Sequence, residues 1–221
     1  MVITATGIAG LINNGGSMRL VLGAHDFGPE IVEAYTMSKE HANDLIETIG
    51  ERITKSLESI EDIISTRRLE ALAWMLAEKK LEIRIAIPKK AYLGSNRGIF
   101  HENLLVFYDE NGCIISAHGS TNETRSAWDA NGESITTFPS WNIGLGEYIR
   151  RHREQFEVIW NNEHKDYFTF SIPVALERRI QQRFYRPENP PLNDILEEIE
   201  PTSNIESLKK LVILSSFVLR T

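Results

Sequence analysis

The feature that most constrains the fold of this chain is a pair of short apolar runs joined by a turn. The runs are Leu104 to Tyr108 and Ile114 to Ala117, and the residues between them are Asp-Glu-Asn-Gly-Cys. An Asn-Gly pair is the strongest short-range signal for a β-hairpin, because both residues tolerate the positive φ of tight hairpin turns. A hairpin brings the residues before its first strand beside those after its second. His101 and Ser120 are therefore predicted neighbours.

Apolar patterns on either side of this hairpin alternate between strands and helices. Leu81 to Ile87 alternates apolar and charged residues, as in a strand with one solvated face. Ser38 to Leu81 has helical spacing, and Arg67 and Arg68 favour two helices over one. The other predicted elements are a helix end at Gly7 to Ile12, strands at Met18 to Leu22 and Ser134 to Phe138, and helices at Gly144 to Trp160 and near Val174 to Phe184. The order predicts an α/β protein, with a mixed β-sheet flanked by helices on both faces.

The acidic balance of the chain limits its partners. A net charge of −7 argues against a broadly basic nucleic-acid binder and leaves room for a local basic groove. Arginines cluster in two places, as Arg150, Arg151 and Arg153 and as Arg178, Arg179, Arg183 and Arg186. Each cluster is either a solvated helix face or part of such a groove.

Cysteine usage and hydropathy indicate a compartment and a domain plan. The single cysteine, Cys113, excludes an internal disulfide framework and fits a reducing environment. No apolar run has the length of a membrane span and no signal peptide is visible, so we expect a cytoplasmic protein without a membrane partner. One domain is expected over residues 1–186, lacking a first strand. Residues 187–221 begin acidic and end apolar, which fits a linker followed by a docked helix or strand, or by the junction to a missing domain.

Several common site motifs are absent. Gly7 and Gly10 follow no strand and lack the third glycine of a dinucleotide fingerprint. The histidines lack metal-ligand spacing, and no Gly-x-Ser-x-Gly element is present. We therefore expect neither a cofactor nor a metal.

The remaining constellation is His101, the run Gly119-Ser120-Thr121-Asn122, and Glu133. An imidazole can attack phosphorus when a carboxylate fixes its tautomer, and Glu133 opens a strand that can reach the same sheet edge. Ser120 and Asn122 offer neutral hydrogen-bond donors for phosphate oxygens. The alternative is that these residues are ordinary components of strand ends and turns.

These residues resemble the motif of the phospholipase D superfamily, which is His-x-Lys, then Gly-Ser-x-Asn, then a glutamate. His101, the Gly119 to Asn122 run and Glu133 match it in order and spacing. The flanking residues, including Ser140-Trp141, are similar to one bacterial branch of nuclease-like domains, which is linked to DEAD/DEAH-box helicases in restriction and phage-defence systems. The resemblance covers most of the chain to about Arg186 and implies a phospholipase D-like α/β/α sandwich.

The resemblance also implies a mechanism. Only one motif copy is present, and single-copy members of the family dimerise so that two histidines face each other. His101 of one subunit would attack a DNA phosphodiester without a metal, and the partner subunit's His101 would protonate the leaving oxygen. Glu133 would orient the histidine, and Ser120 and Asn122 would hold phosphate oxygens. DNA, a second copy and a helicase domain or subunit are the partners so implied.

Asn103 departs from the family pattern, because it stands where the motif has lysine. An asparagine brings a hydrogen bond but no charge, and such a loss commonly costs a factor of about 10² or more in rate. Three explanations fit this asparagine. It is an engineered inactivation, or it is a natural loss in a domain kept for binding or dimerisation, or another residue supplies the cation of the site. Lys89, Lys90 and Arg97 are candidates for that cation. Besides a DNA phosphodiesterase and a binding module, a lipid phospholipase is a third and less favoured interpretation, since no membrane-surface element accompanies the motif.

Overall fold

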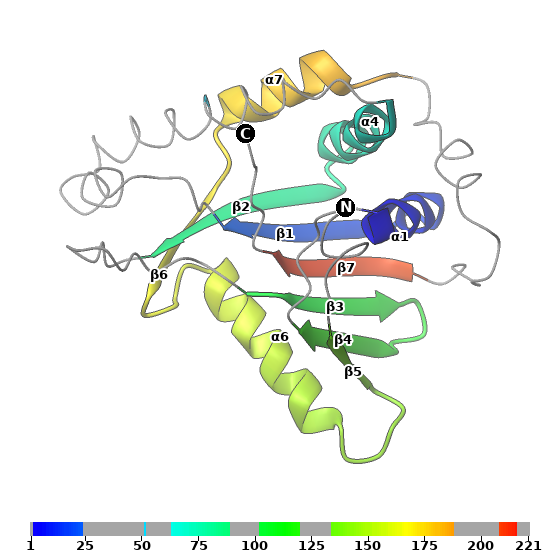
Figure 1. Cartoon of the computed structure of the whole chain (residues 1–221), viewed down its shortest axis with the longest axis vertical. Coiled ribbons are helices and arrows are strands. Elements are labelled where there is room, and N and C mark those ends of the chain that lie inside the picture. Colours follow the sequence, from blue (N-terminus) through cyan, green and yellow to red (C-terminus); the bar gives the residue numbers. More distant parts are fainter. Residues whose placement is uncertain are drawn as a thin grey trace.

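The computed structural model describes residues 2–23, 51, 63–88, 102–119, 134–187 and 208–215 of the chain. Within these residues, seven strands form one sheet in the order β5-β4-β3-β7-β1-β2-β6 (Figure 1). The strands are β1 (Ser17–Gly23), β2 (Leu81–Pro88), β3 (Leu104–Asp109), β4 (Ile114–Gly119), β5 (Ile135–Pro139), β6 (Tyr167–Ser171) and β7 (Leu208–Ser215). The helices are α1 (Val2–Asn13), α4 (Ile63–Ala77), α6 (Gly146–Trp160) and α7 (Val174–Phe184). The chain thus has the mixed α/β content that its sequence predicts.

Three adjacent strands of the sheet, β7, β1 and β2, are parallel. β1 pairs with β2 on one side and with β7 on the other, both in parallel register. All remaining pairs, β2 with β6, β7 with β3, β3 with β4, and β4 with β5, are antiparallel. Because β7 lies between β1 and β3, at least this part of the segment 187–221 belongs to the same sheet as the residues before it.

Successive strand residues contact different helices, as the two-residue period of a strand requires. On β1, Met18 and Leu20 belong to a buried cluster with α1 and α4, whereas Val21 belongs to a cluster with α6. On β3, Leu105 and Phe107 pack against the first cluster, whereas Leu104 and Val106 lie in the second. The cluster against α6 also contains Ala86, Phe156, Ile159 and Trp160.

The carboxyl-terminal half of α6 is fastened to the sheet by apolar and cationic contacts. Phe156 is 1% exposed and stacks on Trp160, with ring centroids 5.6 Å apart. The guanidinium of Arg19 on β1 lies over both rings and forms a bidentate ion pair with Glu157. Arg84 on β2 also lies over the Trp160 ring and donates a hydrogen bond to the Trp160 carbonyl. These contacts with β1 and β2 hold the carboxyl-terminal half of α6 against the sheet.

The hairpin prediction is confirmed. The backbone N–H groups of Asn111 and Cys113 donate to Asp109 Oδ1 over 2.9 and 2.7 Å, and Gly112 adopts a φ of 82°. That conformation disfavours residues with a Cβ, so glycine suits this position. The strand register runs from Leu104 opposite His118 to Tyr108 opposite Ile114.

One local prediction was wrong, and one strand was missed. α4 continues through Arg67 and Arg68 as one helix, so the helical segment does not break at that pair. The strand that was missed is β6. Its sequence, YFTFS, is short, and the stretch before it indicates only that the preceding helix has ended. It pairs with β2 at the edge of the sheet, where pairing with an existing strand supplies most of the stabilisation of a short element.

Candidate functional site

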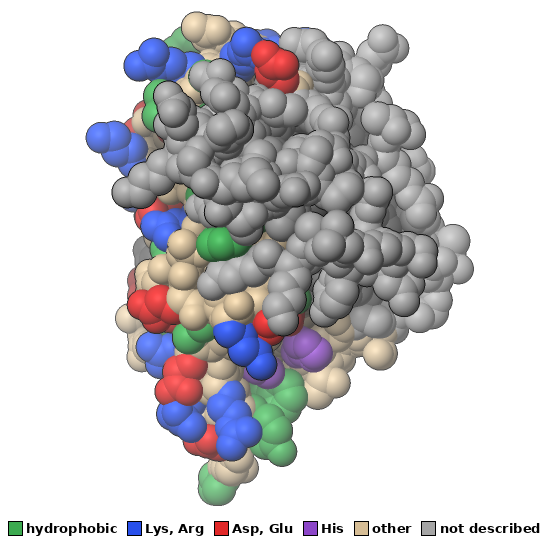
Figure 2. Space-filling view, turned by 90° about the vertical axis from the view of Figure 1, so that its left-hand side faces the viewer, with side chains coloured by type: hydrophobic (Ala, Val, Ile, Leu, Met, Phe, Trp, Pro, Cys, Tyr) green, Lys and Arg blue, Asp and Glu red, His purple; other side chains and the backbone are tan. Residues whose placement is uncertain are grey.

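One end of the sheet collects the strand termini that carry the predicted site. The three parallel strands all finish there, at Gly23, Pro88 and Ser215. The antiparallel registers bring the beginning of β3, the end of β4 and the beginning of β5 to the same end. In open α/β sheets, ligands bind beyond the carboxyl ends of the parallel strands. This end, which we call the site end, lies at the left of Figure 1 and faces the viewer in Figure 2.

The described residues that flank the predicted site residues converge at the site end. The backbone N–H of Gly119 donates to the carbonyl of Asn103 over 3.4 Å, and Gly119 pairs with Ile135 in the β4–β5 register. The backbone of Ser134 approaches Gly119 so closely that a Cβ built at position 119 would lie 2.1 Å from the Ser134 carbonyl oxygen. The residues next to these three strand ends, Asn103, Gly119 and Ser134, therefore lie together at the site end.

Four of the five predicted site residues, His101, Ser120, Asn122 and Glu133, lie outside the described residues, and their assignment stays a prediction. The structure describes the fifth, Asn103, together with Gly119 of the Gly-Ser-x-Asn run. Both take part in the convergence at the site end.

Gly119 is required by a close backbone approach. The atoms nearest to a Cβ at this position are the Ser134 carbonyl oxygen at 2.1 Å and the Ile135 Cα at 3.0 Å. Both belong to the backbone, so no rotamer change can relieve the overlap. The glycine therefore has a structural reason that is independent of any ligand: it lets β5 lie against the end of β4.

Asn103 is a buried residue with an exposed fraction of 9%. It immediately precedes β3, and its carbonyl oxygen closes the open end of the hairpin through the bond to Gly119. A lysine at this place would bring its stem into a nearly closed environment. The ammonium group would then need an anion or water within reach, because a buried unpaired charge is costly.

α6 contacts both halves of the hairpin near the site end. Gln155 Nε2 donates to Glu102 Oε2 over 2.9 Å. His152 Nδ1 lies 2.9 Å from Ser116 Oγ on β4, and its ring lies against Phe138 of β5 with the centroids 5.2 Å apart. These residues were missed at the sequence level. The helical spacing from Ile149 through His152 to Phe156 could have indicated that this histidine faces the sheet.

A pair of histidines lies beside this contact. The ring of His118, an exposed residue of β4, stacks on that of His152 with centroids 6.0 Å apart. Burial, and secondarily the charge of His118, lowers the pKa of His152. Figure 2 shows histidine side chains on this face next to acidic and basic groups. His152 is therefore held in its neutral form more strongly than an ordinary histidine.

Tyr167 begins β6 at the same end of the sheet, opposite Pro88. Burial raises the pKa of its phenol, and the charges of Glu102 and Asp166 raise it further. The side chain therefore stays protonated at neutral pH, in the form that can donate a hydrogen bond.

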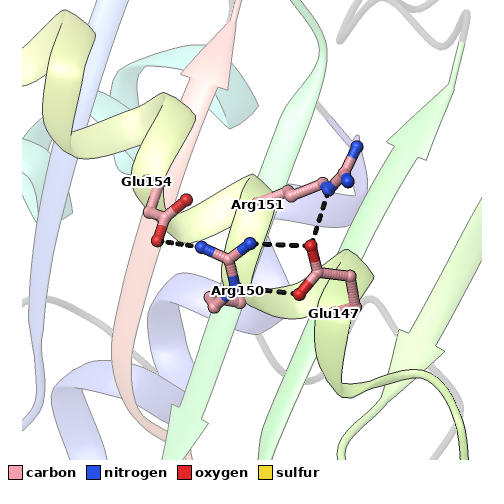
Figure 3. Close-up of polar contacts among 4 residues, drawn as sticks. All are labelled: Glu147, Arg150, Arg151 and Glu154. Carbon is pink, nitrogen blue, oxygen red and sulfur yellow. Dashed lines mark hydrogen bonds and ion pairs between the residues drawn. The ribbon is translucent and has the colours of Figure 1, made fainter.

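The basic cluster at the start of α6 is largely neutralised within the helix. Arg150 bonds Glu147 and Glu154 over 2.7 and 2.5 Å, and Arg151 bonds Glu147 over 2.8 Å (Figure 3). The two guanidinium groups lower the pKa of Glu147 to about 2. Arg150 and Arg151 thus behave as parts of a solvated helix face, which was one of the two expected alternatives.

Three other arginines of the two clusters also have local contacts. Arg153 lies over the ring of Tyr108, and Arg183 lies over the ring of Phe184. Arg186 Nε lies 3.3 Å from the carboxylate of the buried Glu70. The candidate cations Lys89, Lys90 and Arg97 are outside the described residues.

The described residues were also considered as ligands for a metal ion and as membrane-spanning helices. No group of three or more His, Cys, Asp or Glu side chains among them is arranged to hold a metal ion. No described helix has both the length and the apolar character needed to cross a membrane. Comparison of the chain with protein-family models, with curated proteins and with solved structures gave no match in any of the three.

Proposed function

We propose that this chain is a phospholipase D-like phosphodiesterase domain acting on DNA, with its site at the site end of the sheet. The proposed fold is the α/β/α sandwich of that superfamily. It is supported by the two buried clusters, one against α1 and α4 and the other against α6. The proposed setting is cytoplasmic, in a homodimer with a helicase domain or subunit.

The observation that carries the proposal is the convergence of Asn103, Gly119 and Ser134. Each is the described neighbour of a motif segment, since His101 precedes Asn103, Ser120 follows Gly119 and Glu133 precedes Ser134. For one phosphate to contact all three motif segments, the strand ends next to those segments must lie together. The backbone contacts of Gly119 with Asn103 and Ser134 meet this requirement. Antiparallel pairing of β3, β4 and β5 brings these three residues together at the end of the sheet where the parallel strands finish, which is where ligands bind in open α/β sheets.

The proposed reaction proceeds in two displacements at phosphorus. An imidazole nitrogen of His101 forms a P–N bond while the P–O bond of the leaving strand breaks, and the partner subunit's His101 gives its proton to the leaving oxygen. The same partner imidazole then takes a proton from water, whose oxygen attacks phosphorus and breaks the P–N bond. Ser120 and Asn122 would donate to the phosphate oxygens, and Glu133 would hold the tautomer of the nucleophile.

Asn103 makes weak or absent cleavage the expected behaviour. The position is buried at the site end and carries no charge, so it cannot offset the charge that develops on the phosphoryl oxygens. This observation favours one alternative function, a catalytically inactive module that retains nucleic acid or its helicase partner and cleaves nothing. Substitution at this one position separates the two functions.

The test compares three versions of the whole chain for DNA cleavage in EDTA: the parent, Asn103→Lys, and Asn103→Lys combined with His101→Ala. Cleavage by Asn103→Lys alone is the expected result. The double variant is the control for a contaminating nuclease. Because a lysine at a buried position is destabilising, the unfolding midpoint of each variant is measured with and without inorganic phosphate, and Asn103→Lys is expected to gain most from the anion.

The outcomes distinguish the alternatives. If no version cleaves but the parent still retains DNA in a mobility-shift assay, the binding module is the better account. Cleavage that disappears in EDTA would contradict the phosphohistidine mechanism, since that mechanism uses no metal.

A further inference from the structure

The His118–His152 pair is a cluster of ionisable groups that the proposed mechanism does not use. His118 is exposed at the last residue but one of β4, and His152 comes from the sheet-facing side of α6. Their ring centroids are 6.0 Å apart, and the planes are inclined by 26°. Two imidazoles at this separation repel each other when both are protonated.

Among the described residues, no carboxylate forms a hydrogen bond or ion pair with either ring. The contacts of His152 there are with Ser116, Phe138 and His118, none of which carries a negative charge. The carboxylate of Glu102, two residues before β3, accepts a hydrogen bond from Gln155.

The nearby arginines of α6 are also directed elsewhere. Arg151 pairs with Glu147, and Arg153 lies over the ring of Tyr108. A bound anion would therefore meet two titratable imidazoles that form no ion pair with any described residue.

The pair also lies at the site end. His118 directly precedes Gly119, whose N–H bonds the carbonyl of Asn103 and whose backbone borders Ser134. At the end of a sheet, side chains from either face can reach a group placed beyond the strand termini. The imidazole of His118 is thus the described titratable group nearest in sequence to the Gly-Ser-x-Asn run.

We infer that His118 and His152 form a phosphate-binding subsite that takes up a proton as a nucleic-acid phosphodiester binds. The subsite deepens the proposed function and rests on it, because it places titratable positive charge on the α6 face of the sheet, next to the site end. Ser116 orients His152, and the exposed His118 makes the direct contact. The chemistry recognised is a phosphate group, in DNA or as the free anion.

The physical reason is charge balance. Without an anion, protonating either ring places a cation beside its neighbour, and burial further disfavours the charged form of His152. A phosphate beside the rings reverses that preference, because an opposite charge within a few ångströms stabilises the protonated form. Binding should then strengthen as pH falls through the range in which imidazoles titrate.

The first measurement is the affinity for a short labelled DNA duplex, by fluorescence anisotropy at constant ionic strength. For the parent we expect affinity to rise by about tenfold between about pH 8 and about pH 6, which is an average uptake of roughly half a proton over that range. His118→Gln should abolish most of this dependence and should fold normally, because the residue is exposed. His164→Gln is the matched control, since His164 is stacked on Tyr167 instead. Its pH dependence should equal that of the parent.

The second measurement is the pKa of His152 by NMR, with and without inorganic phosphate, together with the ring resonances of the other two histidines. The pKa of His152 should rise with the anion, and the ring resonances of His118 should shift while those of His164 should not. If His118→Gln keeps the full pH dependence, or if phosphate leaves the His152 pKa and the His118 resonances unchanged, the subsite is refuted while the proposed function stands. If phosphate shifts the pair but no version binds DNA, the subsite holds for the free anion and the proposed nucleic-acid function fails.

Discussion

Gly119→Ala is the substitution whose effect follows most directly from the structure. A Cβ at this position would lie 2.1 Å from the Ser134 carbonyl oxygen, whereas ordinary carbon–oxygen contacts lie at about 3.3 Å or more. The backbone of β5 would therefore have to retreat by roughly 1 Å, and the pairing of Gly119 with Ile135 would be lost or weakened. Overpacking of this kind typically costs about 1–3 kcal/mol of the free energy of unfolding.

The assay is equilibrium unfolding in urea, followed by tryptophan fluorescence, with Gly146→Ala as the matched control. Gly146 opens α6, and a Cβ there would meet nothing within 4 Å, so this variant should be unchanged or up to about 1 kcal/mol more stable. The reasoning is refuted if Gly119→Ala is as stable as the parent to within about 0.5 kcal/mol. That result would mean that β5 does not approach the end of β4 as described.

Two further predictions concern α6. Phe156→Ala should lower the free energy of unfolding by about 3–5 kcal/mol because the ring is buried in the cluster under the helix, whereas Tyr148→Ala, at a half-exposed position, should cost much less in the same urea assay. The pKa of Glu147 is about 2, so its contribution to stability is present above its ordinary pKa and is lost as pH falls from about 4.5 towards 2. Carboxyl titration by NMR should show this low pKa in the parent and a higher one in Arg150→Ala; equal values in both proteins would show that Arg150 does not lower it.

Local patterns predicted the elements that depend on local physics. The turn at Asp109 to Gly112 formed as expected because a side-chain acceptor and a glycine with positive φ suffice to close it. The strand before Pro88 and the helix ending at Trp160 have clear periodicities, and both are present. The closeness of Asn103 and Gly119 followed from the hairpin alone, which is why this contact was predictable from the sequence.

Features that depend on distant partners were not predictable. β6 is short and exists through its pairing with β2, and β7 lies between β1 and β3 although its sequence comes from the apolar end of the chain. The roles of His152 and Gln155 depend on how α6 crosses the sheet, which Arg19 and Arg84 help to set from two different strands. Arg67 and Arg68 looked like a helix boundary only because the apolar stripe shifts there; backbone propensity alone continues the helix.

The most direct test of the account is to trap the covalent intermediate. Asn103→Lys is mixed with a DNA phosphodiester substrate in EDTA, quenched in base, digested and analysed by mass spectrometry for peptides that carry a phosphate-linked nucleotide. The account predicts an acid-labile phosphoramidate on the peptide that contains His101, and its loss when His101 is replaced by alanine. Cleavage that proceeds at the same rate with His101→Ala, or an adduct on any other side chain, would contradict it.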